Sequence, residues 1–136
     1  MKVAGILGVM AMVGLPTQHV MCDEANGVVV RIALLEIDPA QLVAYQHAVK
    51  EEITESICNE PGVVSIYSVA EKEHPNRLHF FEIYASDAAY LIHIASSHFQ
   101  KYLAVTKSML VSKRLIETQP IQLSAQARNH RSLSDE

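Results

Sequence analysis

The sequence predicts an α+β domain in which one antiparallel sheet is built in the order strand, helix, strand, strand, helix, strand. Three observations support this order. Residues 28–37, 63–71 and 77–84 are rich in β-branched and aromatic side chains, as strands are. Helix-start signals, "DPAQ" and "ASD", precede the two segments predicted as helices. The polar loop 72–76 joins two of the strands directly, as a hairpin does. This is the ferredoxin-like arrangement, with the helices on one face of the sheet.

The first strand, Val28–Ile37, is apolar on both faces, which is typical of a strand covered on both sides. Asp38 is expected to cap the next helix, with Pro39 in its first turn and Gln41 returning the capping bond. This helix is expected to run to about Cys58. Its apolar stripe is predicted to comprise Leu42, Tyr45, Val49, Ile53 and Ile57. Its solvated face is predicted to carry Lys50, Glu51, Glu52 and Glu55.

The second half of the domain follows from the turn "NEPG" at 59–62, which ends the first helix. Strands are expected at 63–71 and 77–84, with an exposed His74 in the loop between them. Ser86 is predicted to cap the second helix, which breaks near 96–97, restarts and ends at about Leu110. A last strand is expected at about 112–118.

The break in the second helix separates two histidines in the stretch "LIHIASSHFQKY". On one continuous helix, His93 and His98 would point to different faces, because five residues rotate by about 140°. Ser97 is expected to cap the restarted helix, and Gln100 to complete a capping box. A kink at this position lets the two side chains converge. They lack the i, i+4 spacing by which helical histidines share a metal, so no metal is expected.

Composition limits the possible functions. The 136 residues are 49% hydrophobic with a formal net charge of −4, and the eleven lysines and arginines are scattered. Nucleic-acid binding is therefore not expected. Residues 1–26 have the order of a signal peptide, so a periplasmic or secreted location is predicted. A lipid anchor at Cys22 is the less favoured alternative. Residues 27–122 are expected to form the domain, and the polar residues 123–136 a disordered tail.

A homodimer is predicted from the strands, because their second face is also apolar and needs cover. A domain of this length also buries only a modest fraction of its surface alone. A second copy packed sheet against sheet would cover that face. Cys58 falls near the end of the first helix and is expected to be a small buried hydrophobe with no chemistry.

The region Glu60–Leu110, "EPGVVSIYSVAEKEHPNRLHFFEIYASDAAYLIHIASSHFQKYLAVTKSML", resembles the antibiotic biosynthesis monooxygenase domain family. The matching features are the EPG turn, the strand ending "FEIY", the acidic cap with alanines of the next helix, and "H-x-x-S-x-H-F". The likeness extends over about 28–121. It implies a dimeric α/β barrel, in agreement with the predicted dimer.

The family resemblance implies several functions, since its members are diverse. Some oxidise quinols or polyketide phenols with dioxygen and no metal or flavin, one relative isomerises phosphorylated autoinducer-2, and another branch cleaves haem. The haem-cleaving branch relies on a tryptophan and an axial histidine. The matching positions here hold His93 and Leu103, so no haem is expected.

The favoured interpretation is an exported, cofactor-independent monooxygenase that oxidises a small quinol-like or phenolic substrate with dioxygen. His98 is predicted to be the base, kept neutral at a helix start, and His93 to be a second catalytic group with a different protonation state. The predicted substrate-binding residues are Tyr67, Glu82, Tyr84, Tyr102 and Arg31. Arg31 could instead pair with Glu82, which would make that carboxylate structural. His79 could face either side of the sheet.

Two alternatives remain open. A proton-transfer isomerase acting on a small carbonyl or sugar-derived substrate would use the same base, although no Arg and Lys cluster offers a phosphate clamp beside the histidines. A non-enzymatic dimer that binds a small apolar ligand would need only the pocket and would be indifferent to His98.

Overall fold

The computed structural model describes residues 27–125, and the unit Glu24–Leu123 contains every described helix and strand. The expected signal peptide, with Cys22, and most of the expected tail lie outside the described residues. Export and the disorder of the tail therefore stay predictions. No helix in the described part is long and apolar enough to cross a membrane.

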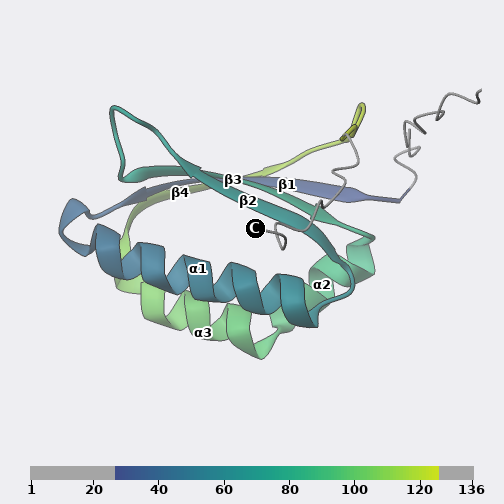
Figure 1. Ribbon diagram of the computed structural model, residues 1–136, viewed down its shortest axis with the longest axis horizontal. Coiled ribbons are helices and arrows are strands. Elements are labelled where there is room, and N and C mark those ends of the chain that lie inside the picture. The colour runs from purple at the N-terminus through teal and green to yellow at the C-terminus, as the bar shows by residue number, and fades with distance from the viewer. Residues whose placement is uncertain (1–26, 126–136) are drawn as a thin grey trace, which may run out of the picture. The chain divides into compact units, whose positions relative to one another are not determined.

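Four strands and three α-helices make up the domain, with a short 3-10 turn beside two of the helices (Figure 1). In chain order they are β1 (Val29–Ile37), η1 (Pro39–Gln41), α1 (Leu42–Asn59), β2 (Val63–Ala70), β3 (Arg77–Tyr84), α2 (Asp87–Ala95), α3 (Ser97–Thr106), η2 (Lys107–Met109) and β4 (Leu110–Glu117).

The strands form one antiparallel sheet in the order β2-β3-β1-β4, and the three helices cover one of its faces (Figure 1). The predicted α+β class, element order and ferredoxin-like arrangement are confirmed. The last helix ends at Thr106 rather than near Leu110, because the chain tightens into η2 and then enters β4 two residues earlier than predicted. Asp38 donates its backbone N–H to the Met109 carbonyl at this junction.

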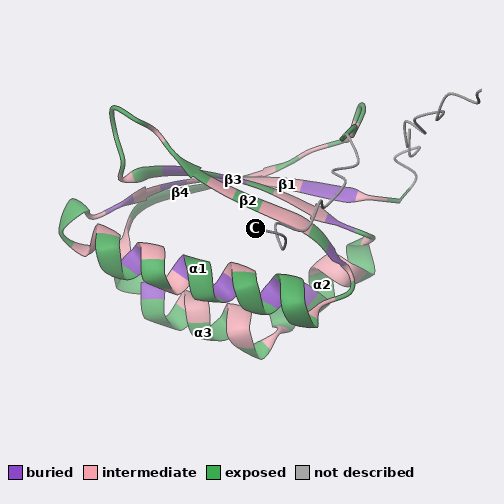
Figure 2. Ribbon diagram, viewed as in Figure 1, coloured by how far each residue is buried: buried purple, intermediate pink, exposed green. Residues whose placement is uncertain are grey.

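The core lies between the sheet and the helices (Figure 2). The helix-facing side chains of β1 and β3 alternate along each strand, as in a half-covered sheet. The larger of two buried clusters contains Ala33, Leu35, Ile37, Tyr45, Val49, Leu78 and Phe80. The smaller contains Val29, Val63 and Tyr84. Fully burying one such large side chain contributes about 1.5–3 kcal/mol.

The buried stripe of α1 differs from the predicted stripe in its second half. The buried positions are Tyr45, Val49, Glu52 and Ser56. Glu52 was expected in solvent, yet it is only 6% exposed, whereas Ile57 is 48% exposed. Cys58, expected to be buried, is exposed. The expectation was wrong because it counted only apolar residues, while the inner face of this half of α1 carries polar side chains.

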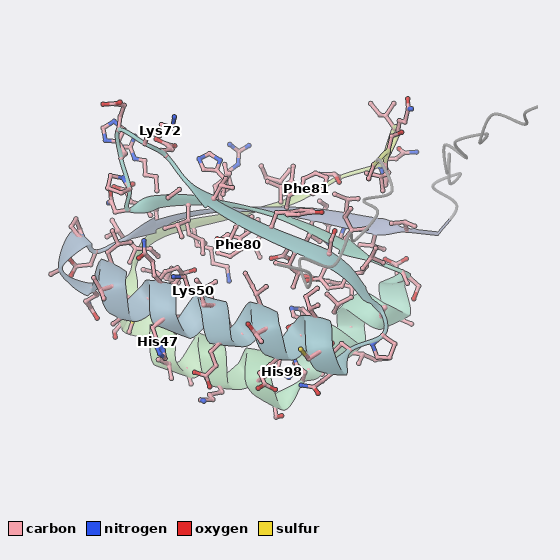
Figure 3. The ribbon with its side chains drawn as sticks, viewed as in Figure 1. His47, Lys50, Lys72, Phe80, Phe81 and His98 are labelled. Atoms are coloured by element: carbon pink, nitrogen blue, oxygen red, sulfur yellow. The ribbon has the colours of Figure 1, made fainter. Side chains whose placement is uncertain are left out.

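The outer face of the sheet is apolar and uncovered in the described part of the chain. Phe80 points toward the helices and Phe81 away from them (Figure 3). Cross-strand pairing aligns Tyr67 with Phe81, Phe81 with Ile32, and Ile32 with Ile116. These four residues form a continuous row across all four strands, which we call the outer row.

Gly62 and Ala89 fix the approach of α2 to the turn that follows α1. A Cβ on Gly62 would lie 2.5 Å from the Ala89 Cβ, closer than two carbon atoms can pack. The Gly62 carbonyl also accepts the Ala85 N–H at 2.9 Å. The turn therefore needs a residue without a side chain where it meets α2.

Candidate functional site

The break between α2 and α3 is confirmed, but the capping residue is Ser96 rather than Ser97. Ser96 has extended backbone angles and its Oγ accepts the Phe99 N–H. Gln100 does not complete a capping box. Its side-chain amide donates to the Ile94 carbonyl at 2.6 Å. Both serines fit an N-cap by type, and the Oγ of Ser96 also lies 3.1 Å from Nε2 of His98.

Replacing Ser96 by alanine is expected to lower the free energy of unfolding by about 0.5–2 kcal/mol, because the Phe99 N–H loses its acceptor. Ser97→Ala is the matched control. Ser97 is exposed and provides no cap, so its loss should change stability by under about 0.5 kcal/mol. Chemical denaturation of both variants checks this, and equal effects would contradict the assignment of the cap.

The two histidines converge on one carboxylate, that of Glu60. Oε1 of Glu60 lies 3.0 Å from Nδ1 of His93 and 2.5 Å from Nε2 of His98. With Glu60 ionised, both nitrogens donate to it, since a carboxylate can only accept. His93 is 2% exposed and the Glu60 side chain 8%, so this contact is shielded from water. In a neutral His93 that carries its proton on Nδ1, the second ring nitrogen, Nε2, carries no proton.

Glu60 follows the last residue of α1, and its backbone N–H donates to the Ser56 carbonyl. Sequence reasoning assigned the "NEPG" stretch only to a turn and missed this glutamate. The signal that could have found it is its place between a helix end and a strand start, where the chain passes close to α2. The other Glu60 oxygen, Oε2, is buried and has no hydrogen-bond partner within the described residues.

Glu52 is the second carboxylate of the site. It accepts a 2.7 Å hydrogen bond from Ser56 Oγ, and its Oε1 lies 3.7 Å from Nε2 of His93. Burial raises the pKa of Glu52, and the Ser56 hydrogen bond only partly offsets this. His93 therefore lies between two buried carboxyl groups, one facing each ring nitrogen. Ligand atoms of Glu52, His93 and His98 lie within 4.8 Å of one another, close enough to consider a metal.

A cavity of about 140 Å³ lies between the sheet and the helices beside this cluster. Five of the predicted site residues line it: Arg31, Glu82, Tyr84, His93 and Tyr102. Glu52, Tyr90 and Phe99 also contribute to its wall, and sequence reasoning did not single them out as site residues. The cavity thus combines aromatic walls with a small number of titratable groups, as ligand sites commonly do.

Two predicted site residues lie elsewhere. Tyr67 is 62% exposed in the outer row, on the far side of the sheet from the cavity. The alternation on β2 was compatible with either face, and the sheet order places Tyr67 outward. His98 does not line the cavity. It lines a hollow of about 40 Å³ together with Glu52, Lys101 and Tyr102, between α1 and α3 (Figure 3).

The alternative Arg31–Glu82 pair does not form among the described residues, although the two are register partners on β1 and β3. Arg31 lies over the Tyr90 ring at 4.8 Å and 3.9 Å from the exposed Glu117. Glu82 accepts a 2.8 Å hydrogen bond from the Tyr84 hydroxyl. Burial raises the pKa of Glu82, which favours its protonated form. A neutral carboxyl group therefore needs no cation beside it.

The tyrosines of the cavity are neutral hydrogen-bonding groups. The hydroxyls of Tyr45 and Tyr102 lie 2.6 Å apart, and burial raises the pKa of Tyr102 to about 12. Burial also raises the pKa of Tyr84. A chain of ring contacts joins Tyr84 of β3 to His93, Phe99 and Tyr102 of the helices. His79 is outside this group, because it faces outward and contacts Glu71 at 2.9 Å.

Comparison with known proteins decides the family. The model of the antibiotic biosynthesis monooxygenase family matches residues 28–105. The chain belongs to this family. No curated protein matches it.

Solved structures agree with membership in the antibiotic biosynthesis monooxygenase family. A proposed antibiotic biosynthesis monooxygenase from Bacteroides thetaiotaomicron is 45% identical, with a TM-score of 0.70 over 72% of this chain and 93% of the other. A proposed monooxygenase from Lactobacillus acidophilus is 32% identical, with a TM-score of 0.65 over 71% of this chain and 46% of the other. A protein from Caulobacter crescentus, 18% identical with a TM-score of 0.67 over 71% of this chain and 92% of the other, shares the fold.

Proposed function

We propose that the protein is a cofactor-independent monooxygenase that oxidises a one-ring quinol or phenol with dioxygen. The observation that carries this proposal is His93 in the cavity wall, with Nδ1 held by the buried Glu60 and Nε2 left to take a proton. A carboxylate that fixes the tautomer and orientation of an imidazole is a recurring way to prepare a general base. The base is therefore assigned to His93 rather than to His98.

The chemistry requires a base because a phenolate gives an electron to dioxygen far more readily than a phenol does. His93 takes the hydroxyl proton, and the anion passes one electron to dioxygen. The resulting radical and superoxide combine to form a carbon–oxygen bond. Loss of the ring C–H proton and cleavage of the O–O bond then release water. One hydroquinone and one dioxygen give one hydroxyquinone and one water, so no external reductant is needed.

The cavity supports a substrate of one ring. Its volume of about 140 Å³ is close to that of an engineered cavity of roughly 150 Å³ that binds benzene in T4 lysozyme. Burial raises the pKa of Glu82, on the sheet side of the cavity, and so favours the protonated form, in which it would donate a hydrogen bond to a developing oxyanion. Aromatic side chains in the cavity wall would limit the contact of water with the reactive intermediate.

The second histidine provides a route for the proton. His98 shares Oε1 of Glu60 with His93, and its side chain reaches the hollow between α1 and α3. When His98 also carries a proton on Nδ1, its release into the hollow would balance the proton that His93 takes from the substrate, while the Nε2–H of His98 stays on Glu60. In this proposal His98 acts through Glu60 and does not touch the substrate.

Oxygen uptake by the purified, chelator-treated protein tests the function. One-ring hydroquinones should be consumed with one dioxygen each, and mass spectrometry should show the hydroxyquinone. Two-ring quinols should react more slowly, because the cavity is too small for them. Binding of a one-ring phenol without any uptake would instead favour the ligand-binding protein, and proton exchange at a carbonyl substrate without uptake would favour the isomerase.

We also propose that the protein is a homodimer paired through the outer row. Exposed apolar surface of this extent is typical of an interface, and a sheet-to-sheet contact would cover it. Light scattering at micromolar concentration should give twice the mass of the chain. Phe81→Asp should yield monomer, whereas Val43→Asp, at an apolar and more exposed position on α1, should leave the dimer intact. A well-folded wild-type monomer would contradict this prediction.

A further inference from the structure

We propose that Glu52, His93 and His98 bind one divalent transition-metal ion, and that this ion inhibits the oxidation by occupying the base. Two imidazoles and one carboxylate are a ligand set that Zn²⁺ takes in proteins, with a fourth position left open. The residues come from α1, α2 and α3, so the ion would join the three helices.

The donor atoms are near the geometry that an ion requires. One oxygen of Glu52 and one nitrogen of each histidine lie within 4.8 Å of one another. Ligands bound to one Zn²⁺ at about 2.0–2.1 Å are at most about 4 Å apart. An ion bound by these three residues would therefore draw their ligand atoms closer together by side-chain adjustment. Nε2 of His93 already lies 3.7 Å from Oε1 of Glu52.

Glu60 supplies the support that metal-binding histidines usually have. Such a histidine donates its other ring N–H to a carboxylate, which fixes its orientation and makes the ligand nitrogen more basic. Nδ1 of His93 and Nε2 of His98 both face Oε1 of Glu60. This leaves Nε2 of His93 and Nδ1 of His98 as ligands. One buried carboxylate thus orients both imidazoles.

Charge also favours a cation at this cluster. The ion pairs that Glu52 and Glu60 make within residues 27–125 are to the two histidines, with no lysine or arginine. Oε2 of Glu60 is buried and lacks a partner in the same range, in a side chain more than nine-tenths buried. A divalent ion would balance two carboxylates with neutral imidazoles. The hollow lined by Glu52 and His98 gives it a path from the surface.

Isothermal titration calorimetry of the untagged full chain with Zn²⁺, after chelator treatment, tests the site. We expect one ion per chain, and Co²⁺ in its place should give visible absorption bands. Glu52→Gln and His98→Ala should each weaken binding at least about tenfold, and Glu60→Gln about 10–100-fold. Glu52→Gln retains the acceptor for Ser56, so its fold should be preserved. His79→Ala is the matched control, because His79 also contacts a glutamate but lies on the outer face.

The inference fails if the wild-type chain binds no Zn²⁺, or if Glu52→Gln and His98→Ala bind as tightly as wild type. It rests on the site of the proposed function, yet the two are tested separately. Oxidation by metal-free protein that binds no Zn²⁺ would overturn only the metal site. Binding as described by a protein that oxidises no quinol would overturn only the proposed function. If both hold, saturating Zn²⁺ should abolish oxygen uptake.

Discussion

Replacing His93 by glutamine is expected to lower kcat for quinol oxidation by about 10²–10⁴, the usual effect of removing a general base. Glutamine can still donate a hydrogen bond toward Glu60, so the buried carboxylate keeps a partner. It cannot accept the substrate proton at neutral pH. Oxygen uptake with an accepted one-ring hydroquinone, together with binding of an unreactive phenol, measures the two effects separately. Substrate affinity should change far less than turnover.

Two comparisons make the His93 result decisive. His79→Gln changes a histidine on the outer face and should retain full activity. His98→Ala should slow turnover less than His93→Gln, because His98 does not line the cavity, and external imidazole should restore part of the rate. If His98→Ala abolishes turnover while His93→Gln does not, the base is His98. A loss in proportion to unfolded protein would make either residue structural.

Replacing Gly62 by alanine should destabilise the protein by about 1–3 kcal/mol, the usual cost of an added methyl group in a packed contact. The new Cβ would meet the Ala89 Cβ at 2.5 Å, so α2 must move away from the turn. Glu60 is two residues before Gly62, and His93 is one turn of α2 after Ala89. The same shift should therefore lengthen the Glu60–His93 contact and lower kcat. The midpoint temperature of thermal unfolding and the rate of oxygen uptake should both fall.

A second substitution tests whether the steric conflict with Ala89 causes the losses of stability and turnover in Gly62→Ala. Ala89→Gly removes the atom that the new side chain meets. Alone it should cost about 0.5–1 kcal/mol, because glycine weakens a helix. Combined with Gly62→Ala, it should restore both stability and turnover toward the Ala89→Gly level. Strictly additive losses in the double variant would show that the contact between these two residues is not the reason.

The fold was predictable because its signals are local. The start of the first helical segment depends on neighbouring residues: Asp38 accepts the Ala40 N–H and caps η1, the turn that leads into α1, rather than α1 itself. The break between His93 and His98 was also predictable, from a pair of serines inside an apolar helix. Which of the two serines caps α3 could not be predicted, because both are of the preferred type and the sequence alone does not fix the residue at which the helix restarts.

The candidate site was predictable only in part. Its histidines were found because histidine is uncommon and the break brings them together. Two of its carboxylates were missed, because Glu52 resembles the other glutamates of a solvated helix and Glu60 those of a surface turn until packing buries them. Arg31 and Glu82 were rightly placed on neighbouring strands. Their alternative pairing does not form, and burial instead raises the pKa of Glu82 and favours its protonated form, which depends on the surrounding cavity.

The cavity has two walls with different origins. The groups proposed to move protons, His93, Glu60 and His98, belong to the helices and the turn after α1. The opposite wall is made by strand residues such as Arg31, Glu82 and Lys113. Substitutions of strand side chains can therefore change the substrate, while the proton-moving groups of the helices and the turn stay the same. New specificity would then evolve on the sheet without first losing the reaction.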